Sequence, residues 1–121
     1  MAWHSLKEVP AVGTVEFEQK ALAPYSVLPA VEGAAFSSSF SHIFAGGYSA
    51  GYYSYKWAEV LEADAFSLFK EKGIFNTEVS ESFRKNILEK GGAEDEAEIY
   101  RNFRGHDPQP EALMKKLGLT K

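Results

Sequence analysis

The run from His42 to Trp57 constrains the fold more than any other part of this chain. One histidine, four tyrosines and three glycines fall within the fourteen positions from His42 to Tyr55. Glycine lets a backbone approach a ligand closely, and histidine and tyrosine carry hydrogen-bond donors on rigid rings. A helical pattern follows at once. The chain therefore has to hold a polar, glycine-rich surface against the start of a long helix.

That helix is predicted to run from about Ser49 to Lys72. Its apolar residues recur at spacings of four, four and three, which places them on one helical face. These residues are Trp57, Leu61, Ala65 and Leu68, with Val60 and Asp64 alongside them. Gly73 suits the position after the last turn, where lysines are also favoured by the helix dipole.

Three more helices are predicted after Gly73 from start and stop residues. The first begins after Asn76 or Thr77 and stops at Gly91-Gly92. The next spans about Glu94 to Phe103, and the last begins at Pro110. Their expected inward residues are Phe83, Ile87 and Leu88, then Ala97, Tyr100 and Phe103, then Leu113, Met114 and Leu117, with Gly118 at the final C-cap. No alternation of period two is long enough to require a sheet, so the predicted class is all-α.

Residues 1–40 differ from the rest because prolines and glycines interrupt them. One short helix is predicted over Thr14–Leu22, with Thr14 as a possible cap and Pro24 as the reason it ends. Residues 25–40 read as an extended segment ending in a serine turn at 37–39. We thus divide the chain into an irregular lead-in, 1–40, and a helical subdomain, 41–121. Such a long lead-in is unusual in a stand-alone domain, so we expect part of a larger helical domain.

Composition excludes several classes of protein and site. The net charge is −4 with both signs interspersed, so no basic stripe indicates a nucleic-acid partner. The chain has no cysteine, which excludes disulfides and thiolate metal sites and favours a reducing compartment. No run approaches the length of a membrane span. The simplest interpretation is a cytoplasmic protein without nucleic-acid or membrane partners, although a mature secreted fragment would have the same features.

Motifs for self-contained catalysis are missing from the sequence. The three histidines lie far apart, and neither HExxH nor His-x-x-x-His occurs, so no metal site is predicted within this chain. His4 and His106 are expected as surface or capping residues. Gly46-Gly47 is not followed by GK[ST], and the serine run lacks a nucleophile elbow.

The tyrosines allow two interpretations from their pattern alone. Tyr48, Tyr52 and Tyr55 are separated by four and three residues and would share one helical face, where they could bind a ligand. Tyr53 and Trp57 would lie on the packed face. Aromatic residues at the start of a helix most often pack into a core, so the pattern leaves both possibilities open.

A family resemblance favours the ligand-binding interpretation. The run Phe40–Trp57 closely resembles the thimet oligopeptidase family of zinc peptidases, in its bacterial oligopeptidase A and peptidyl-dipeptidase branch. The similarity continues through Asp64-Ala65-Phe66, Gly73-Ile74-Phe75-Asn76, Ile87-Leu88, Gly91-Gly92, Phe103-Arg104-Gly105-His106, Pro108 and Ala112-Leu113. It covers about residues 24–119, and residues 1–23 match more loosely.

The resemblance implies a helical zincin-type catalytic domain that hydrolyses short peptides inside the cell. It assigns His42 and Tyr48 to hydrogen bonds with the backbone of the bound peptide. It assigns Tyr52 to the same substrate-facing wall of the site. It assigns Tyr55 to donation toward the developing oxyanion, and Gly46-Gly47 to a loop that closes on substrate. The zinc and its HExxH helix would belong to a missing part of a longer parent protein, so the chain alone is predicted to be inactive.

An alternative of a different class remains open at this point. The chain is then a non-catalytic helical module that binds peptides or pairs with a separate zinc-bearing chain. In either case, a surface that would normally face a missing part can mediate a homodimer.

Overall fold

The computed structural model describes residues 2–120, and all regular structure within that range is helical. The predicted all-α class is therefore confirmed. The chain forms two compact units, one ending at Ser54 and the other starting at Tyr55. Over residues 2–120, none of the helices combines the length and apolar character that a membrane crossing requires.

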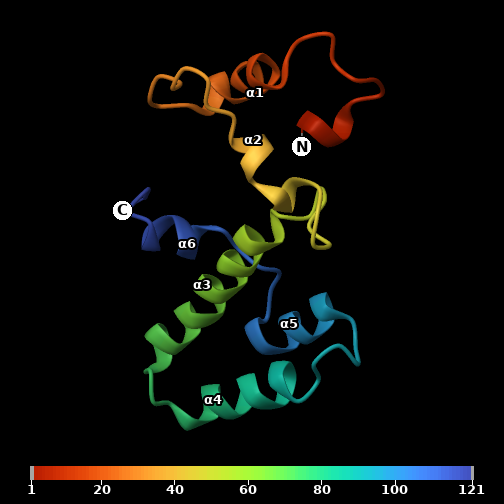
Figure 1. The fold of residues 1–121 in the computed structure, drawn as a ribbon. Helices are drawn as coiled ribbons and strands as arrows, with labels where there is room; N and C mark the ends of the chain where they lie inside the picture. Colours follow the sequence, from red (N-terminus) through yellow and green to blue (C-terminus); the bar gives the residue numbers. More distant parts are fainter. Residues whose placement is uncertain (1, 121) are drawn as a thin grey trace. The chain divides into compact units, whose positions relative to one another are not determined.

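The first unit contains α1 (Thr14–Leu22) and the short α2 (Phe36–Ser39), with 3-10 turns at Ala2–Ser5, Ala23–Tyr25 and Ser41–Ile43 (Figure 1). The predicted bounds of α1 are confirmed. Thr14 as its cap is wrong, because Gly13 is the N-cap and makes no side-chain hydrogen bond. Thr14 already has helical geometry, one residue too late to cap. The predicted serine turn is instead the single turn of α2.

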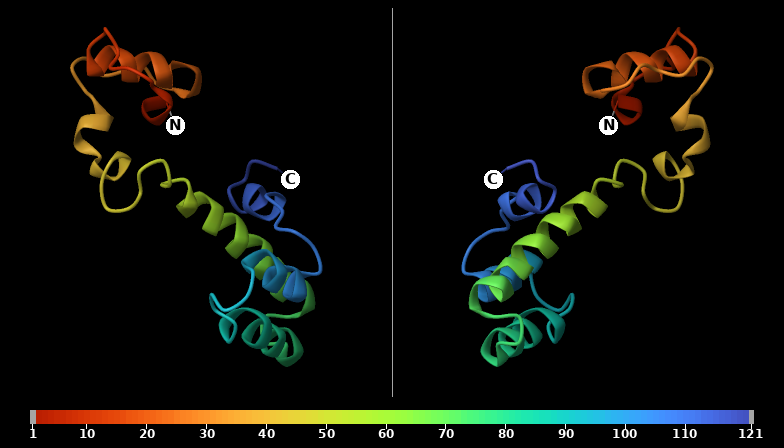
Figure 2. Two further views of the ribbon diagram at one scale, coloured as in Figure 1. Left: turned by 90° about the vertical axis from the view of Figure 1, so that its right-hand side faces the viewer. Right: turned by 90° about the vertical axis from the view of Figure 1, so that its left-hand side faces the viewer.

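The second unit is built from α3 (Ser54–Lys72), α4 (Thr77–Phe83), α5 (Glu96–Arg104) and α6 (Glu111–Lys116). A π-helical turn, Arg84–Leu88, extends α4. Figure 2 shows α4 and α5 lying beside the far half of α3 in both views. Side-chain caps decide two of the helix starts. The Asn76 side chain accepts from the Val79 amide at 3.1 Å, and the Asp95 side chain accepts from the Glu98 amide at 3.0 Å.

Four predicted helix ends, in α3, α5 and α6, differ from the structure. The helix α3 starts at Ser54 rather than Ser49, because tight turns occupy the preceding residues and Ala50 has a left-handed φ of 54°. The helix α5 starts at Glu96 rather than Glu94, because Asp95 is its cap. Pro110 is the N-cap of α6 rather than its first residue, and Leu117 rather than Gly118 is its C-cap.

Aromatic rings connect the helices of the second unit. Phe69 of α3, Phe83 of α4 and Phe103 of α5 meet with ring centroids 5.1–6.2 Å apart. Phe103 is buried, as are Ile99 and Leu113 of the same unit. This cluster gives three helices a common apolar contact.

A buried polar network fixes α5 on α3. The Tyr100 hydroxyl donates to Asp64 Oδ2 at 2.6 Å, and Arg104 donates to both carboxylate oxygens at 3.2 and 3.3 Å. Burial acts to raise the pKa of Asp64, but hydrogen bonds from Arg104 and Tyr100 and the charges of Arg104 and His106 outweigh it and lower that pKa. Burial and the neighbouring Asp64 raise the pKa of Tyr100.

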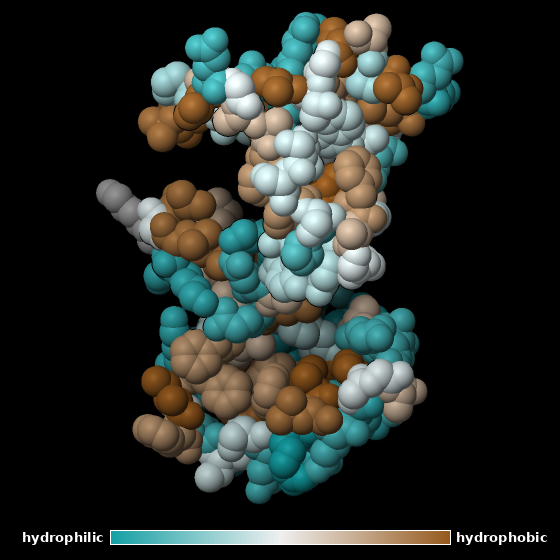
Figure 3. All heavy atoms as spheres, in the orientation of Figure 1, coloured by the Kyte–Doolittle hydropathy of each residue, from teal (hydrophilic) through white to brown (hydrophobic). Residues whose placement is uncertain are grey.

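The predicted inner faces are partly wrong. Asp64 is only 3% exposed, whereas Trp57 is 51% exposed. Asp64 lies alongside the predicted apolar face of α3 and is buried there with Arg104 as its partner, and Leu61, Ala65 and Leu68 are half-buried, so Trp57 is the residue of that face that is exposed. Leu88, Ala97, Met114 and Leu117 are likewise exposed rather than inward. Figure 3 shows apolar side chains gathered at the surface over α3 and the start of α4, where Phe66, Ile74 and Phe75 are exposed.

Candidate substrate-binding surface

A loop with unusual backbone geometry joins the 3-10 turn at Ser41–Ile43 to α3. Gly46 and Gly47 both have left-handed φ values, 71° and 76°, which a residue with a Cβ rarely adopts. The Gly51 amide then donates to the Tyr48 carbonyl at 2.8 Å. The sequence requires glycine at this bend for conformational reasons, and the bend turns the chain back toward the first unit's aromatic residues.

Five aromatic rings, Phe36, Phe40, His42, Tyr48 and Tyr52, form a continuous cluster in the first unit. Phe40 stacks on Phe36 at 4.8 Å and on His42 at 5.2 Å, measured between ring centroids. Tyr52 stands edge-on to Phe40 at 4.8 Å and to His42 at 5.6 Å. Tyr48 lies 5.0 Å from His42 and 6.2 Å from Tyr52. Three of the predicted site residues are thus brought together.

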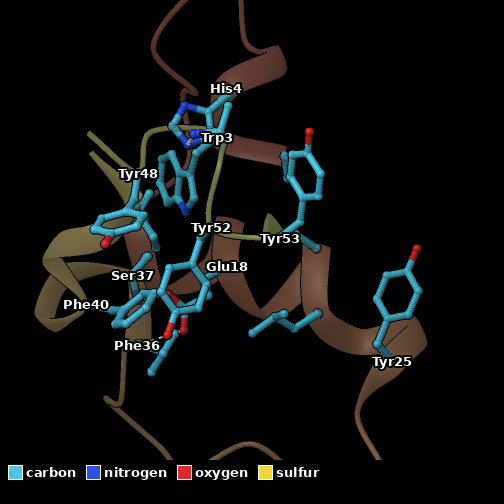
Figure 4. A pocket seen from close by; sticks show the side chains of 15 residues that line it. Trp3, His4, Glu18, Tyr25, Phe36, Ser37, Phe40, Tyr48, Tyr52 and Tyr53 are labelled. Carbon is cyan, nitrogen blue, oxygen red and sulfur yellow. Dashed lines mark hydrogen bonds between the residues drawn. The ribbon is translucent and has the colours of Figure 1, made fainter. Parts of the chain in front are cut away.

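An open groove of about 660 Å³ lies beside this aromatic cluster, within the first unit (Figure 4). Tyr48 and Tyr52 line it, together with Tyr53. The remaining polar or aromatic lining residues are Trp3, His4, Glu18, Tyr25, Phe36, Ser37 and Phe40. The groove offers mostly apolar ring surface with a few polar atoms, a composition typical of small-molecule and peptide sites.

The N-terminal residues of the first unit support the glycine loop. The Ala50 amide donates to His4 Nε2 at 3.2 Å, and the His4 ring meets the Phe44 ring edge-on at 5.3 Å. Trp3 packs against Phe17 at 4.4 Å. His4 is exposed, as predicted, but its contact with Ala50 was not anticipated. Forty-six residues separate the two, and no local pattern indicates such a contact.

Glu18 is the other site residue that sequence reasoning missed. It is 8% exposed, and its carboxylate accepts hydrogen bonds from the amides of Phe36 at 2.7 Å and Ser37 at 2.6 Å. Burial acts to raise the pKa of Glu18, but hydrogen bonds at Ser37 and Phe36 together outweigh it and lower that pKa. An acidic residue on an amphipathic helix is normally read as solvated, so only the structure reveals this role.

The predicted tyrosine strip needs correction in its geometry. Tyr48 and Tyr52 precede α3, so they do not share a helical face with Tyr55; their rings approach through the loop instead. Tyr53 is 68% exposed and lines the groove, so its predicted place on a packed face is wrong. Tyr55 lies in the first turn of α3, in the second unit, and is 48% exposed. Its role in the site stays a prediction.

Comparison with known proteins decides the family. The model of the family described as Peptidase family M3 matches residues 1–119. The chain belongs to peptidase family M3. The resemblance to the thimet oligopeptidase family, in its oligopeptidase A and peptidyl-dipeptidase branch, is thereby confirmed.

Individual relatives of this M3 chain agree with the assignment. Oligopeptidase A of Escherichia coli (strain K12) is 52% identical over 94 residues, covering 78% of this chain and 14% of that protein. Probable cytosolic oligopeptidase A of Arabidopsis thaliana is 46% identical over 108 residues, covering 86% of this chain and 15% of that protein. Dipeptidyl carboxypeptidase of Salmonella typhimurium is 42% identical over 123 residues, covering 100% of this chain and 18% of that protein. The chain therefore spans less than a fifth of the length of these relatives.

Residues 2–120 do not provide a zinc site of their own. Within that range, no group of three or more histidine, aspartate or glutamate side chains is placed to hold a metal ion. Zinc coordination in proteins usually needs three or four such ligands. The metal that the family resemblance implies does not fit the described residues.

Proposed function

We propose that this chain forms the substrate-binding part of a cytoplasmic zinc metallo-oligopeptidase that hydrolyses short peptides. Family membership supports the peptidase chemistry. The observation that carries the proposal is the clustering of His42 with Tyr48 and Tyr52, two residues that line an open groove. Rings buried in a core would have argued against it. Tyr52 is 43% exposed, and His42 and Tyr48 are each partly exposed.

Each proposed role follows from the chemistry of the side chain. His42 and Tyr48 would hydrogen-bond the backbone of a bound peptide, which has a donor and an acceptor at almost every residue. Tyr52 would contribute ring surface beside them. Tyr55 would donate its hydroxyl to the oxyanion that forms at the scissile carbonyl. Removing one such donor typically costs about 3 kcal/mol of transition-state stabilisation.

The left-handed pair Gly46-Gly47 would let the loop close over a peptide and reopen. Loops of this kind exclude water during chemistry and often control product release. Because the residues described here do not fit a metal, the zinc would be bound by the HExxH-bearing part of a longer protein. When bound there, zinc would polarise the scissile carbonyl and supply an activated water.

The chain alone is predicted to be inert toward peptides. Incubation with added zinc and a quenched fluorescent peptide should leave the fluorescence at the level of a blank. Chelator-sensitive cleavage by the purified chain would contradict the proposal that the zinc is bound by another part of a longer protein.

A graft tests the substrate-binding role directly. The segment of Salmonella typhimurium dipeptidyl carboxypeptidase that aligns with this whole chain would be replaced by the chain itself. We expect the hybrid to retain zinc-dependent peptidase activity, and to lose most of it when His42 is changed to alanine. A folded, zinc-loaded hybrid without activity would contradict the proposal. Peptide binding by the isolated chain alongside that result would favour a non-catalytic binding module.

A further inference from the structure

We propose that Glu18 is a positioning residue that sets the geometry of the aromatic cluster Phe36, Phe40, His42, Tyr48 and Tyr52. The proposal rests on the proposed function only in identifying that cluster as the peptide-binding wall. Glu18 does not belong to the glycine–tyrosine motif, and its side chain reaches the cluster from α1.

The first step is the pair of hydrogen bonds that Glu18 accepts. One carboxylate oxygen accepts from the Phe36 amide at 2.7 Å, and the other accepts from the Ser37 amide at 2.6 Å. Phe36 and Ser37 are the first two residues of α2, whose opening amides have no partner within the helix. The N-cap residue Ala35 has no side-chain acceptor to offer them. Glu18 therefore takes the place of a local cap from 18 residues away.

The second step is the stiffness of this attachment. Glu18 is 8% exposed, and charge-assisted hydrogen bonds are shorter and stronger than neutral ones. A carboxylate that is held by two adjacent amides fixes both the position and the direction of the backbone at residue 36. A helix of only four residues has little stability of its own, so α2 depends on such external support.

The third step is the contact from α2 to the site. The Phe36 ring stacks on Phe40 at 4.8 Å with an interplanar angle of 23°, and Phe40 stacks on His42 at 5.2 Å with an angle of 24°. The same Phe40 ring supports Tyr52. A shift of the backbone at residue 36 would therefore pass through two stacked rings to the imidazole and phenol groups that are proposed to hold the peptide.

Nuclear magnetic resonance on the isotope-labelled full chain tests this inference without relying on activity. In Glu18→Gln, one amide at the start of α2 loses its acceptor, because a side-chain NH₂ replaces one carboxylate oxygen. We expect the ring signals of Phe40, His42 and Tyr52 to shift, and affinity for a short phenylalanine-containing peptide to fall by about tenfold. The matched control is Glu16→Gln, which removes the same charge from an exposed position on the same helix. It should leave both measurements unchanged.

An acid titration of the wild-type chain gives a second measurement in case Glu18→Gln fails to fold. The other titratable groups lining the groove are His4, Tyr25, Tyr48, Tyr52 and Tyr53, none of which is a carboxylic acid. As Glu18 becomes protonated, the Phe36 and Ser37 amide signals and the Phe40 ring signals should move with a single midpoint. His42 also titrates and its ring stacks on Phe40 at 5.2 Å. Movement of the Phe40 signals therefore supports the positioning role only where it follows the midpoint of the Phe36 and Ser37 amides, which Glu18 contacts directly.

The outcomes separate this inference from the proposed function. Unchanged ring signals in a folded Glu18→Gln variant would overturn the positioning role. Phe40 signals that do not change as Glu18 becomes protonated would overturn it as well. The ring signals can also move in Glu18→Gln while His42→Ala changes neither peptide binding by the chain nor the activity of the hybrid. That result would support the positioning role and contradict the proposed function.

Discussion

The ring of Phe40 stands almost perpendicular to the ring of Tyr52, at 88°, with their centroids 4.8 Å apart. This edge-to-face geometry is the favoured one for two aromatic rings. Because Phe40 also stacks on His42, one apolar residue sets the orientation of two residues that are proposed to bind substrate. Phe40 itself need not touch a peptide to affect its binding.

Replacing Phe40 by alanine should loosen the aromatic cluster. We expect the first unit to lose about 2 kcal/mol of stability, the sum of lost apolar burial and lost ring contacts. Near-ultraviolet circular dichroism should show weaker aromatic signals. The control is Phe75→Ala, which removes the same side chain from a position that is 95% exposed and should change stability by less than about 0.5 kcal/mol. Equal effects of the two variants would show that Phe40 does not organise the cluster.

The proposed oxyanion donor can be tested in the dipeptidyl carboxypeptidase hybrid. Tyr55→Phe removes only a hydroxyl, so kcat should fall by about 10²–10³-fold while the melting temperature stays the same. Tyr53→Phe is the matched control, since Tyr53 is a neighbouring exposed tyrosine without an assigned donor role. A Tyr55→Phe hybrid that keeps its kcat would remove Tyr55 from the mechanism.

The sequence predicted which aromatic residues gather more closely than it predicted the residues that support them. The glycine–tyrosine run indicated His42, Tyr48 and Tyr52, and the structure brings these three together. Glu18 and His4 were missed because their partners lie 18 to 46 residues away, and no spacing rule connects such positions. The type of a residue indicates which chemistry its side chain can perform. Contacts between residues far apart in the sequence become visible only in the folded structure.

The helices were predicted where local chemistry decides them. Asn76 or Thr77 was expected to cap a helix, and the Asn76 side chain does so. The start of α3 was placed too early, since the left-handed Ala50 and the turns around it leave no trace in hydrophobic periodicity. The predicted inner face of α3 is wrong at Trp57, which is 51% exposed, and hydrophobic periodicity gave no sign that the buried Asp64 pairs with Arg104.

Removal of the Asp64 charge should destabilise the second unit strongly. Asp64→Asn leaves Arg104 buried without its counter-charge, and breaking such a pair from one side typically costs about 3–5 kcal/mol. Hydrogen exchange of the α5 amides should accelerate accordingly. The control, Glu62→Gln, breaks the exposed pair with Lys116 and should cost less than about 1 kcal/mol. A small effect of Asp64→Asn would mean that the aromatic contacts alone hold α5 in place.

The same carboxylate should make the second unit sensitive to acid. The folded-state pKa of Asp64 lies below its unfolded value, so its contribution is complete above about pH 4 and is lost as the pH falls through the folded-state pKa. The stability difference between the wild-type chain and Asp64→Asn should therefore shrink in acid. Hydrogen exchange in α5, measured from neutral pH downward and corrected for intrinsic rates, checks this. A stability difference between the two proteins that stays constant with pH would contradict the conclusion that Asp64 stabilises the second unit in its charged form.

The glycine pair provides a test of loop motion that is separate from the aromatic contacts. Gly47→Ala places a Cβ where no atom lies within 4 Å, so only the backbone strain at φ 76° changes, at a cost of about 1–2 kcal/mol. In the hybrid enzyme, a loop that must close on substrate should respond with a change in kcat and KM together. Gly92→Ala is the control, because that glycine also has open space around it but no left-handed φ. If Gly47→Ala lowers stability yet leaves both kinetic constants unchanged, the glycines shape a static loop, and closure over the peptide has to be assigned to another segment.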